Sequence, residues 1–170
     1  MVNKIFYGLI IVILITSAIF GYFYFFKQND QVIIKRNLEK LAQKASKSEE
    51  SGGVSLYTSS HAVDKLIADK VILEVGYAEA DATYSKYTFS NQILRAKTAF
   101  QYLKFTIYDS VVKLNPDKKS ATVTFTIDAN GRLKSGQVFN DVKDVVATVI
   151  KNNEGKWVFR KFSLQRVVYK

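Results

Sequence analysis

The stretch "KNNEGKWVFRKFSLQRV", residues 151–167, has the pattern of a β-hairpin: the end of one strand, a tight turn and the start of another strand. Asn152 and Gly155 stand at the turn, where Gly adopts backbone conformations that other residues rarely adopt. Aromatic and β-branched residues follow, as is typical of strands. The apolar alternation slips between Phe159 and Phe162, which predicts a β-bulge. We therefore expect an antiparallel hairpin with a bulged second strand.

Three further strand segments are predicted directly upstream of this hairpin. The segment 105–114 is rich in β-branched and aromatic residues, and the segment 121–129 alternates apolar residues with threonines. Pro116 is well placed for a type I turn between them. A loop is expected at 130–136, because it begins with Asn-Gly, a favoured turn pair. The next strand is expected over 137–151, so four long strands follow one another to the hairpin's end.

Helices are predicted ahead of these strands. The first is indicated by apolar residues at helical spacing: Ile34, Leu38, Leu41 and Ala45. The polar, glycine-containing segment 48–53 ends this helix. A second helix is expected over Leu56–Ala68, where apolar residues again share one face.

A strand is predicted after the second helix, over residues 70–77, and a short further strand over 87–89. Ser90 is a good N-cap for a third helix over 91–104. The order is then helix, helix, strand, short strand, helix and four long strands. This order predicts an α+β domain of about three helices packed on a curved antiparallel sheet.

A run without charge from Ile5 to Phe26 precedes this domain. It is long enough to span a bilayer as a helix, and it is apolar on all sides, unlike an amphipathic core helix. A cleaved signal, cut after Ala18, is the alternative, but the apolar run continues well beyond that residue. We therefore expect a single-span membrane anchor over 1–28 and one folded domain over 29–170.

The direction of this anchor is ambiguous in the sequence. Only Lys4 and the terminal amine precede the run, as in a bacterial signal-anchor that exports the part of the chain following it. Four basic residues follow the run, and the positive-inside rule would keep them in the cytoplasm: Lys27, Lys35, Arg36 and Lys40. We expect the domain on the extracytoplasmic side of the bacterial inner membrane, close to the bilayer.

The order of elements and the final hairpin resemble the nuclear transport factor 2-like superfamily, the cone fold shared with ketosteroid isomerase and SnoaL-like proteins. The last hairpin of these proteins typically has a polar turn with Gly, then a basic residue, Trp and an apolar residue. The matching residues here are Gly155, Lys156, Trp157 and Val158. The resemblance covers roughly residues 30–169, and the order of elements carries more of it than the hairpin motif.

More narrowly, the chain looks like the membrane-anchored bacterial members of that superfamily. The resemblance implies a possible pocket inside the cone and a possible homodimer through the sheet. It also extends to the bitopic inner-membrane assembly subunit of type IV secretion systems, which places one membrane helix before a periplasmic cone domain. That subunit usually has a longer cytoplasmic head than the residues that precede Ile5 here.

The composition of the chain excludes several kinds of site and partner. The chain has one histidine and no cysteine, so we expect no transition-metal site, and we find no phosphate-binding loop or other cofactor motif. The net charge is +10, but the basic residues are scattered, so nucleic acid is not expected as a partner. A lipid bilayer, an envelope protein or a small apolar ligand fits the chain better.

Candidate acid–base residues are few. His61 is a candidate general base with Asp64 three residues on, although a histidine at a helix start is usually a surface residue. Glu74 alternates with apolar neighbours in its strand, so it lines a cavity or faces solvent. Asp141 and Asp144 are three residues apart in a strand, and should therefore lie on opposite faces.

These observations favour a membrane-anchored, non-catalytic binding or assembly module. The alternative is a pocket enzyme, similar to isomerases and cyclases, that acts on a small apolar or lipid-like molecule. A second alternative is an assembly subunit of a secretion system.

Overall fold

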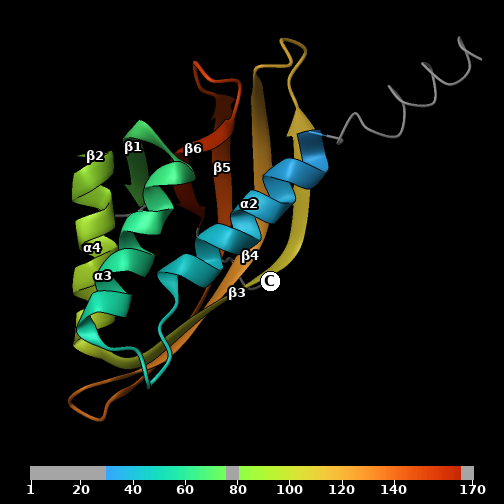
Figure 1. Cartoon of the computed structure of the whole chain (residues 1–170). Helices are drawn as coiled ribbons and strands as arrows, with labels where there is room; N and C mark the ends of the chain where they lie inside the picture. Colours follow the sequence, from blue (N-terminus) through green and yellow to red (C-terminus); the bar gives the residue numbers. More distant parts are fainter. Residues whose placement is uncertain (1–29, 76–80, 166–170) are drawn as a thin grey trace, which may run out of the picture.

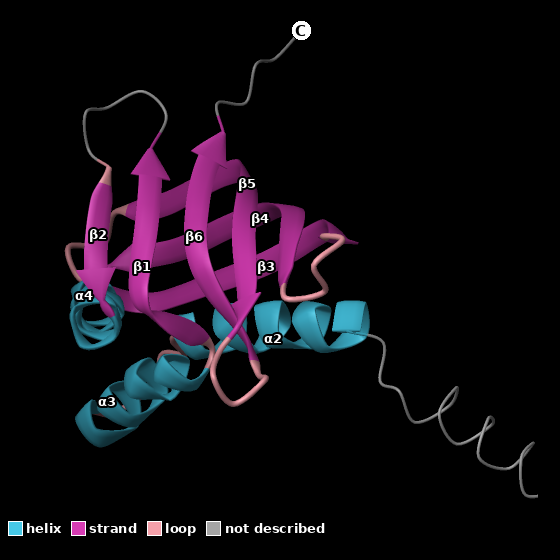
Figure 2. Ribbon diagram, turned by 90° about the horizontal axis from the view of Figure 1, so that it is seen from above, coloured by secondary structure: helices cyan, strands magenta, loops and turns pink. Residues whose placement is uncertain are grey.

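The computed structural model describes residues 30–75 and 81–165. Figure 1 shows the described helices gathered on one face of a curved sheet, and Figure 2 shows the same layers from above. The elements in chain order are α2 (Asp30–Ala45), α3 (Gly53–His61), the 3-10 helix η1 (Ala62–Lys65), β1 (Ile67–Val75), β2 (Ala82–Ser85), α4 (Lys86–Ala99), β3 (Phe100–Leu114), β4 (Ser120–Leu133), β5 (Val138–Lys151) and β6 (Trp157–Gln165). The predicted α+β class is confirmed.

The six strands form one sheet in the order β2-β1-β6-β5-β4-β3. The strands β3 to β6 form the predicted antiparallel meander, and β2 pairs with β1 in antiparallel fashion. The expectation of a wholly antiparallel sheet is wrong at one place, because β1 pairs with β6 in parallel. These two strands lie far apart in the sequence, so no hairpin forces them into opposite directions.

The final hairpin has the predicted form. Gly155 has a φ of +72° in its turn. Val149 pairs with Phe159 and Thr148 with Lys161, so Arg160 is the extra residue of a bulge. Because of this bulge, Phe159 and Phe162 both point into the core, where their rings stack 5.6 Å apart.

The same hairpin is bound to the start of α2. The Asp30 carboxylate accepts a hydrogen bond from Trp157 Nε1 at 2.9 Å and from Lys151 Nζ at 3.1 Å. Lys151 also lies over the Trp157 ring, 4.8 Å from its centroid. Asn37, two turns along α2, donates to the backbone oxygen of Trp157. The predicted signature residue Trp157 therefore ties the first described helix to the last hairpin.

The second and third helices differ from their predicted positions. The expected helix over Leu56–Ala68 is wrong at both ends, because α3 begins at Gly53 and ends at His61. A 3-10 turn follows, and β1 already begins at Ile67. The apolar residues after His61 belong to this turn and strand, which periodicity over a short segment does not distinguish from helix.

The third helix begins earlier than expected. Ser85 is the N-cap of α4, and its Oγ accepts a hydrogen bond from Thr88 N at 3.1 Å. The strand expected at 87–89 is therefore the first turn of α4, and Ser90 lies inside the helix. The helix also ends at Ala99, because the aromatic and β-branched residues that follow form β3.

The Asn-Gly pair at 130–131 does not form the predicted loop. Gly131 lies within β4, where a Cβ atom would come within 2.8 Å of both the Phe100 ring and the Tyr102 backbone oxygen. Close approach of neighbouring backbone, and not a turn, therefore explains this glycine. The turn between β4 and β5 contains Gly136, whose φ is +90°. The turn at Pro116 is confirmed by a hydrogen bond from Lys118 N to Asn115 O.

The predicted membrane anchor, from Ile5 to Phe26, lies outside the described residues. Within residues 30–75 and 81–165, no helix has the length and apolar character needed to cross a membrane. The predicted boundary between 1–28 and 29–170 stays a prediction.

Candidate functional site

The space between the helices and the sheet holds an apolar cavity of about 400 Å³. All sixteen lining side chains are apolar. The helices contribute Leu38 and Leu41 from α2, and Phe89 and Ile93 from α4. Helical spacing places each pair on one side of its helix, so both helices turn an apolar side toward the sheet.

The inner faces of the strands form the opposite wall of this cavity. Phe125 of β4 and Phe162 of β6 lie deep in it, with 5% and 9% of their surfaces exposed. The Phe89 ring lies parallel to the Phe162 ring, with centroids 6.3 Å apart. The β6 bulge turns the Phe162 side chain to the inner face of the sheet, and so makes Phe162 part of the cavity lining.

The cavity occupies only one end of the domain. At the other end, the inner positions of the strands are fully covered, including Ile67 of β1, Val123 of β4 and Ala147 of β5. Toward the ends of β1 and β6, the inner residues Leu73 and Leu164 are only partly buried, and both line the cavity. The domain is therefore solid at one end and hollow at the other.

The histidine candidate lies outside this lining. His61 Nδ1 is 3.4 Å from the Asp64 carboxylate, which also accepts a hydrogen bond from the buried Ser90 hydroxyl. The His61 ring lies between Tyr57 and Tyr87, with centroids 4.4 and 5.6 Å away. Ser90 binds Asp64 and not His61, so this arrangement joins α3, η1 and α4 and does not activate the serine.

The second candidate, Glu74, is on the outer face of the sheet. Its carboxylate forms an ion pair with Lys161 at 2.5 Å and accepts a hydrogen bond from the Ser163 hydroxyl at 2.7 Å. These contacts, first of all the one with Lys161, lower the pKa of Glu74 below its usual range. Of the two predicted orientations, the structure places this side chain toward solvent.

The strand aspartates lie on opposite faces, as predicted. Asp144 accepts a hydrogen bond from Thr126 on the outer face, at 2.7 Å. Asp141 lies on the inner face and forms an ion pair with Lys143 at 2.6 Å. Within the described residues, no cluster of three His, Cys, Asp or Glu side chains could hold a metal ion.

Lys97 is a buried residue that the sequence reasoning missed. Its side chain is fully covered, and its Nζ donates to Lys44 O at 2.6 Å and to Ser59 Oγ at 2.7 Å. Burial, and then the charge of Lys44, lower its pKa to about 8. Its position four residues after Ile93 was the available signal, since this spacing places both on one side of α4.

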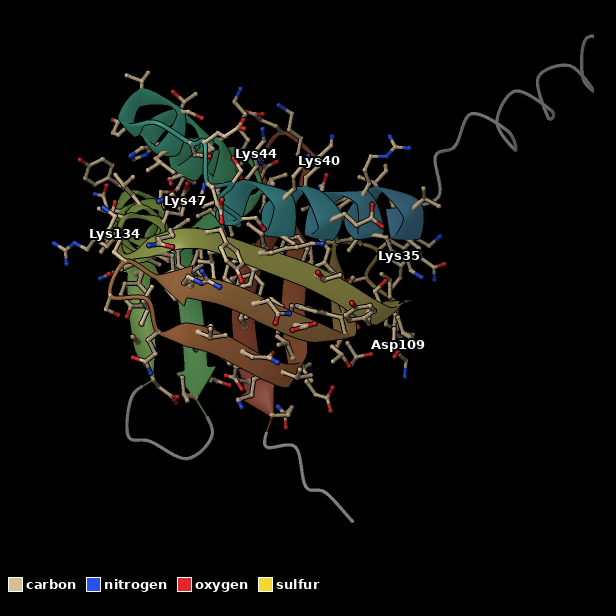
Figure 3. All side chains as sticks on the ribbon, turned by 90° about the horizontal axis from the view of Figure 1, so that it is seen from below. Lys35, Lys40, Lys44, Lys47, Asp109 and Lys134 are labelled. Atoms are coloured by element: carbon tan, nitrogen blue, oxygen red, sulfur yellow. The ribbon has the colours of Figure 1, made fainter. Side chains whose placement is uncertain are left out.

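Basic side chains follow the outer side of α2. Figure 3 shows Lys35, Lys40 and Lys44 along this helix, with Lys47 and Lys134 near its end. Lys47 Nζ donates to Phe100 O at 2.5 Å, and partial burial together with the charge of Lys134 lowers its pKa. This surface is therefore strongly positive, and it is separate from the cavity.

No protein-family model matches the chain, and no curated protein matches its sequence. Solved structures do match its fold. One is a nuclear transport factor 2-like superfamily protein from Salmonella enterica serovar Typhimurium, with a TM-score of 0.60 and 7% identity over 79% of this chain and 89% of that chain.

Two similar structures come from Novosphingobium aromaticivorans. The first is a nuclear transport factor 2-like protein with a cystatin-like fold, with a TM-score of 0.61 and 12% identity over 91% of each chain. The second is described as a candidate scytalone dehydratase, with a TM-score of 0.61 and 15% identity over 80% of this chain and 83% of that chain. At these identities the likeness concerns the fold alone, and this chain has the α+β cone fold of nuclear transport factor 2-like proteins.

Proposed function

We propose that the domain binds a small apolar or lipid-like molecule in the cavity between α2, α4 and the sheet. The observation that supports this most is the cavity itself, which has about 400 Å³ of space and only apolar lining residues. Ligand sites in proteins typically have volumes of about 300–1,000 Å³ and mostly apolar walls. Water gains little in such a space, because the lining offers it no hydrogen-bond partners.

A pocket enzyme is the second candidate, because a protein described as a candidate scytalone dehydratase shares the fold. The comparisons agree better with a pocket for small molecules than with a purely structural assembly module. Acid–base catalysis needs an ionisable group within reach of the ligand. Within the described residues, His61, Asp64 and Glu74 are not part of the lining, so binding is the function that we place first.

Membrane attachment is a separate part of the proposal. The uncharged run from Ile5 to Phe26 supports a single span that presents the domain close to the bilayer. In the sequence, only residues 27–29 lie between this run and Asp30, the first described residue of α2. A bilayer would also be a natural source of lipid-like ligands. An extracytoplasmic position at the bacterial inner membrane stays the expected location.

Energy transfer from Trp157, the one tryptophan of the chain, to the uncharged probe phenylnaphthylamine tests ligand binding by the full chain in detergent, with protein-free micelles as the blank. We expect its emission to rise on binding, and the substitution Ala96→Phe to weaken binding about tenfold, because the new ring occupies space that Ala96 leaves open. Ala99→Phe is the matched control, since Ala99 ends the same helix outside the lining. Equal binding by both variants would contradict the proposal.

A further inference from the structure

The outer side of α2 carries a row of basic side chains. Arg36, Lys40 and Lys44 are spaced four residues apart, so they follow one another along the helix, and all three are exposed. Lys35 is exposed beside the start of this row. We call these four residues the basic face of α2. Figure 3 shows its three lysines along the helix.

Few acidic residues oppose this charge. Lys47 and Lys134 extend it beyond the end of the helix, as Figure 3 shows, while Glu39 lies within the helix and the exposed pair 49–50 follows it. Within the described residues, no ion pair neutralises a residue of the basic face. The rest of the sequence adds a single acidic residue, Glu79. The basic face therefore has a charge that no carboxylate of the chain balances.

The uncharged run from Ile5 to Phe26 comes shortly before this helix in the sequence. With residues 27–29 between them, Phe26 and Asp30 can be at most about 14 Å apart, even along a fully extended chain. The field of a charged surface extends about 8–10 Å in physiological salt. If the run spans a bilayer, the start of α2 therefore cannot move far from the field of its lipids.

We propose that the basic face of α2 docks on anionic lipid headgroups of the bilayer that holds the uncharged run. The inference rests on the proposed membrane attachment, and it adds the surface that faces the bilayer and the charge of the lipid. In the docked state, α2 lies along the membrane and does not stand away from it. Each Lys or Arg near an anionic surface adds to the attraction, and the tether keeps the local concentration of lipid high.

The shape of the basic face favours a flat partner. From Lys35 to Lys44 the helix rises about 14 Å along a nearly straight axis, so its basic side chains can reach one plane of headgroups together. Val32 begins the same row, four residues before Arg36, and exposes 51% of its surface. Basic residues beside an exposed apolar side chain are typical of helices at a membrane surface. A nucleic acid backbone would offer no apolar partner to this valine.

The opposite side of α2 forms a wall of the cavity, through Leu38 and Leu41. A helix with its side chains is about 10 Å across. Docking of the basic face therefore holds the cavity about one helix diameter from the headgroups. A lipid-like ligand would then meet the domain at the surface from which it comes.

A fluorescent label on α2 tests the inference in the full chain. Because the chain has no cysteine, Gln43→Cys provides one labelling site, at an exposed position next to Lys44. The labelled chain is placed in lipid nanodiscs that contain a lipid with a nitroxide on its headgroup, which quenches the label on close approach. We expect quenching to be about twofold stronger in phosphatidylglycerol than in phosphatidylcholine. The difference should vanish in about 1 M salt, where charges are screened within about 3 Å.

Two double variants of the labelled chain identify the surface. Arg36→Gln with Lys40→Gln should lower the ratio of docked to undocked domain roughly tenfold, because each charge contributes to the attraction. Lys70→Gln with Arg132→Gln is the matched control, since both residues are exposed and strand alternation places them on the outer face of the sheet, away from the helices. The control should keep the difference between the lipids. Circular dichroism shows that both variants are folded.

The outcomes separate this inference from the proposed membrane attachment. If the label responds equally in both lipids, or if the Arg36 and Lys40 variant behaves like its control, the inference is wrong and the attachment stands. Release of the chain from vesicles by alkaline carbonate would show that no span holds it, and would overturn both. A DNA duplex added to phosphatidylcholine discs tests the other kind of polyanion. If DNA changes the emission and phosphatidylglycerol does not, the basic face binds nucleic acid and the inference is wrong.

Discussion

Lys97 lies among α2, α3 and α4, where its ammonium group has two oxygen acceptors and, within the described residues, no carboxylate partner. Folding therefore favours the uncharged amine, and burial lowers the pKa from 10.5 to about 8. Below pH 8 the residue is charged in both the folded and the unfolded chain, so the cost of burying the charge is fully present. Between about pH 8 and 10.5 the unfolded chain binds more protons, so the free energy of unfolding rises with pH.

The substitution Lys97→Met should remove this rise. The difference between the two pKa values corresponds to about 3 kcal/mol of stability that the natural chain gains across this pH range. Denaturant unfolding at several pH values from 7 to 10.5 measures it. The exposed Lys40→Met serves as control and should keep the rise. A Lys97→Met variant with an unchanged pH profile would show that the buried amine is not its source.

Single residues were also where prediction from the sequence was weakest. The pattern of Phe159 and Phe162 predicted the bulge, because alternation is a local property that a shift of one residue visibly breaks. The roles of Ser90 and Lys97 depend on partners from other elements, Asp64 and Ser59 among them. No spacing rule within one helix could have identified those partners.

At the scale of elements, Gly131 shows how two strands and a side chain fit together. The β3–β4 pair brings the Phe100 ring and the Tyr102 backbone oxygen against the Cα atom of this glycine. The ring could rotate away from an added methyl group, but the backbone oxygen belongs to the strand and could not move alone. Asn-Gly usually predicts a turn, and here the packing of one strand on its neighbour overrides that preference.

Gly131→Ala should destabilise the domain by about 1–3 kcal/mol, the usual cost of overpacking. Thermal unfolding measures the change. Gly53→Ala is a suitable control, because a Cβ atom there would meet nothing within 4 Å at the first residue of α3. If both variants unfold at the same temperature, the close contact at Gly131 carries no energetic cost.

At the scale of the whole molecule, one end of the domain has a fully packed core and the other end holds the cavity. The α+β class and the order of the elements could be predicted from periodicity, and the cone fold was implied by the resemblance to nuclear transport factor 2-like proteins. The cavity could not, because its lining residues are apolar like those of any core. Only the distances between α2, α4 and the sheet show that the side chains leave a space.

We propose that two copies of the chain associate through the outer face of the sheet. Tyr108, Val111 and Val142 expose 50%, 61% and 43% of their surfaces there, and apolar patches of this kind often mark interfaces. Val111→Lys should convert the dimer to a monomer in sedimentation measurements in detergent. Val54→Lys, at an exposed position on α3, should not. A monomeric natural chain would exclude this association.

The place of β6 in the sheet has a consequence for the synthesis of the protein. This strand is the last described element to leave the ribosome, yet it lies between β1 and β5 and supplies Trp157, Phe159 and Phe162 to the core. Asp30 of α2 accepts a hydrogen bond from Trp157 in the same hairpin, so this contact also forms only after β6 has been made. Until β6 emerges, β1 and β2 are not joined to the rest of the sheet, because β6 is the strand that pairs with both β1 and β5. The apolar inner face of the sheet is incomplete until then. Folding must therefore follow synthesis of nearly the whole domain, with contacts of long sequence separation forming late.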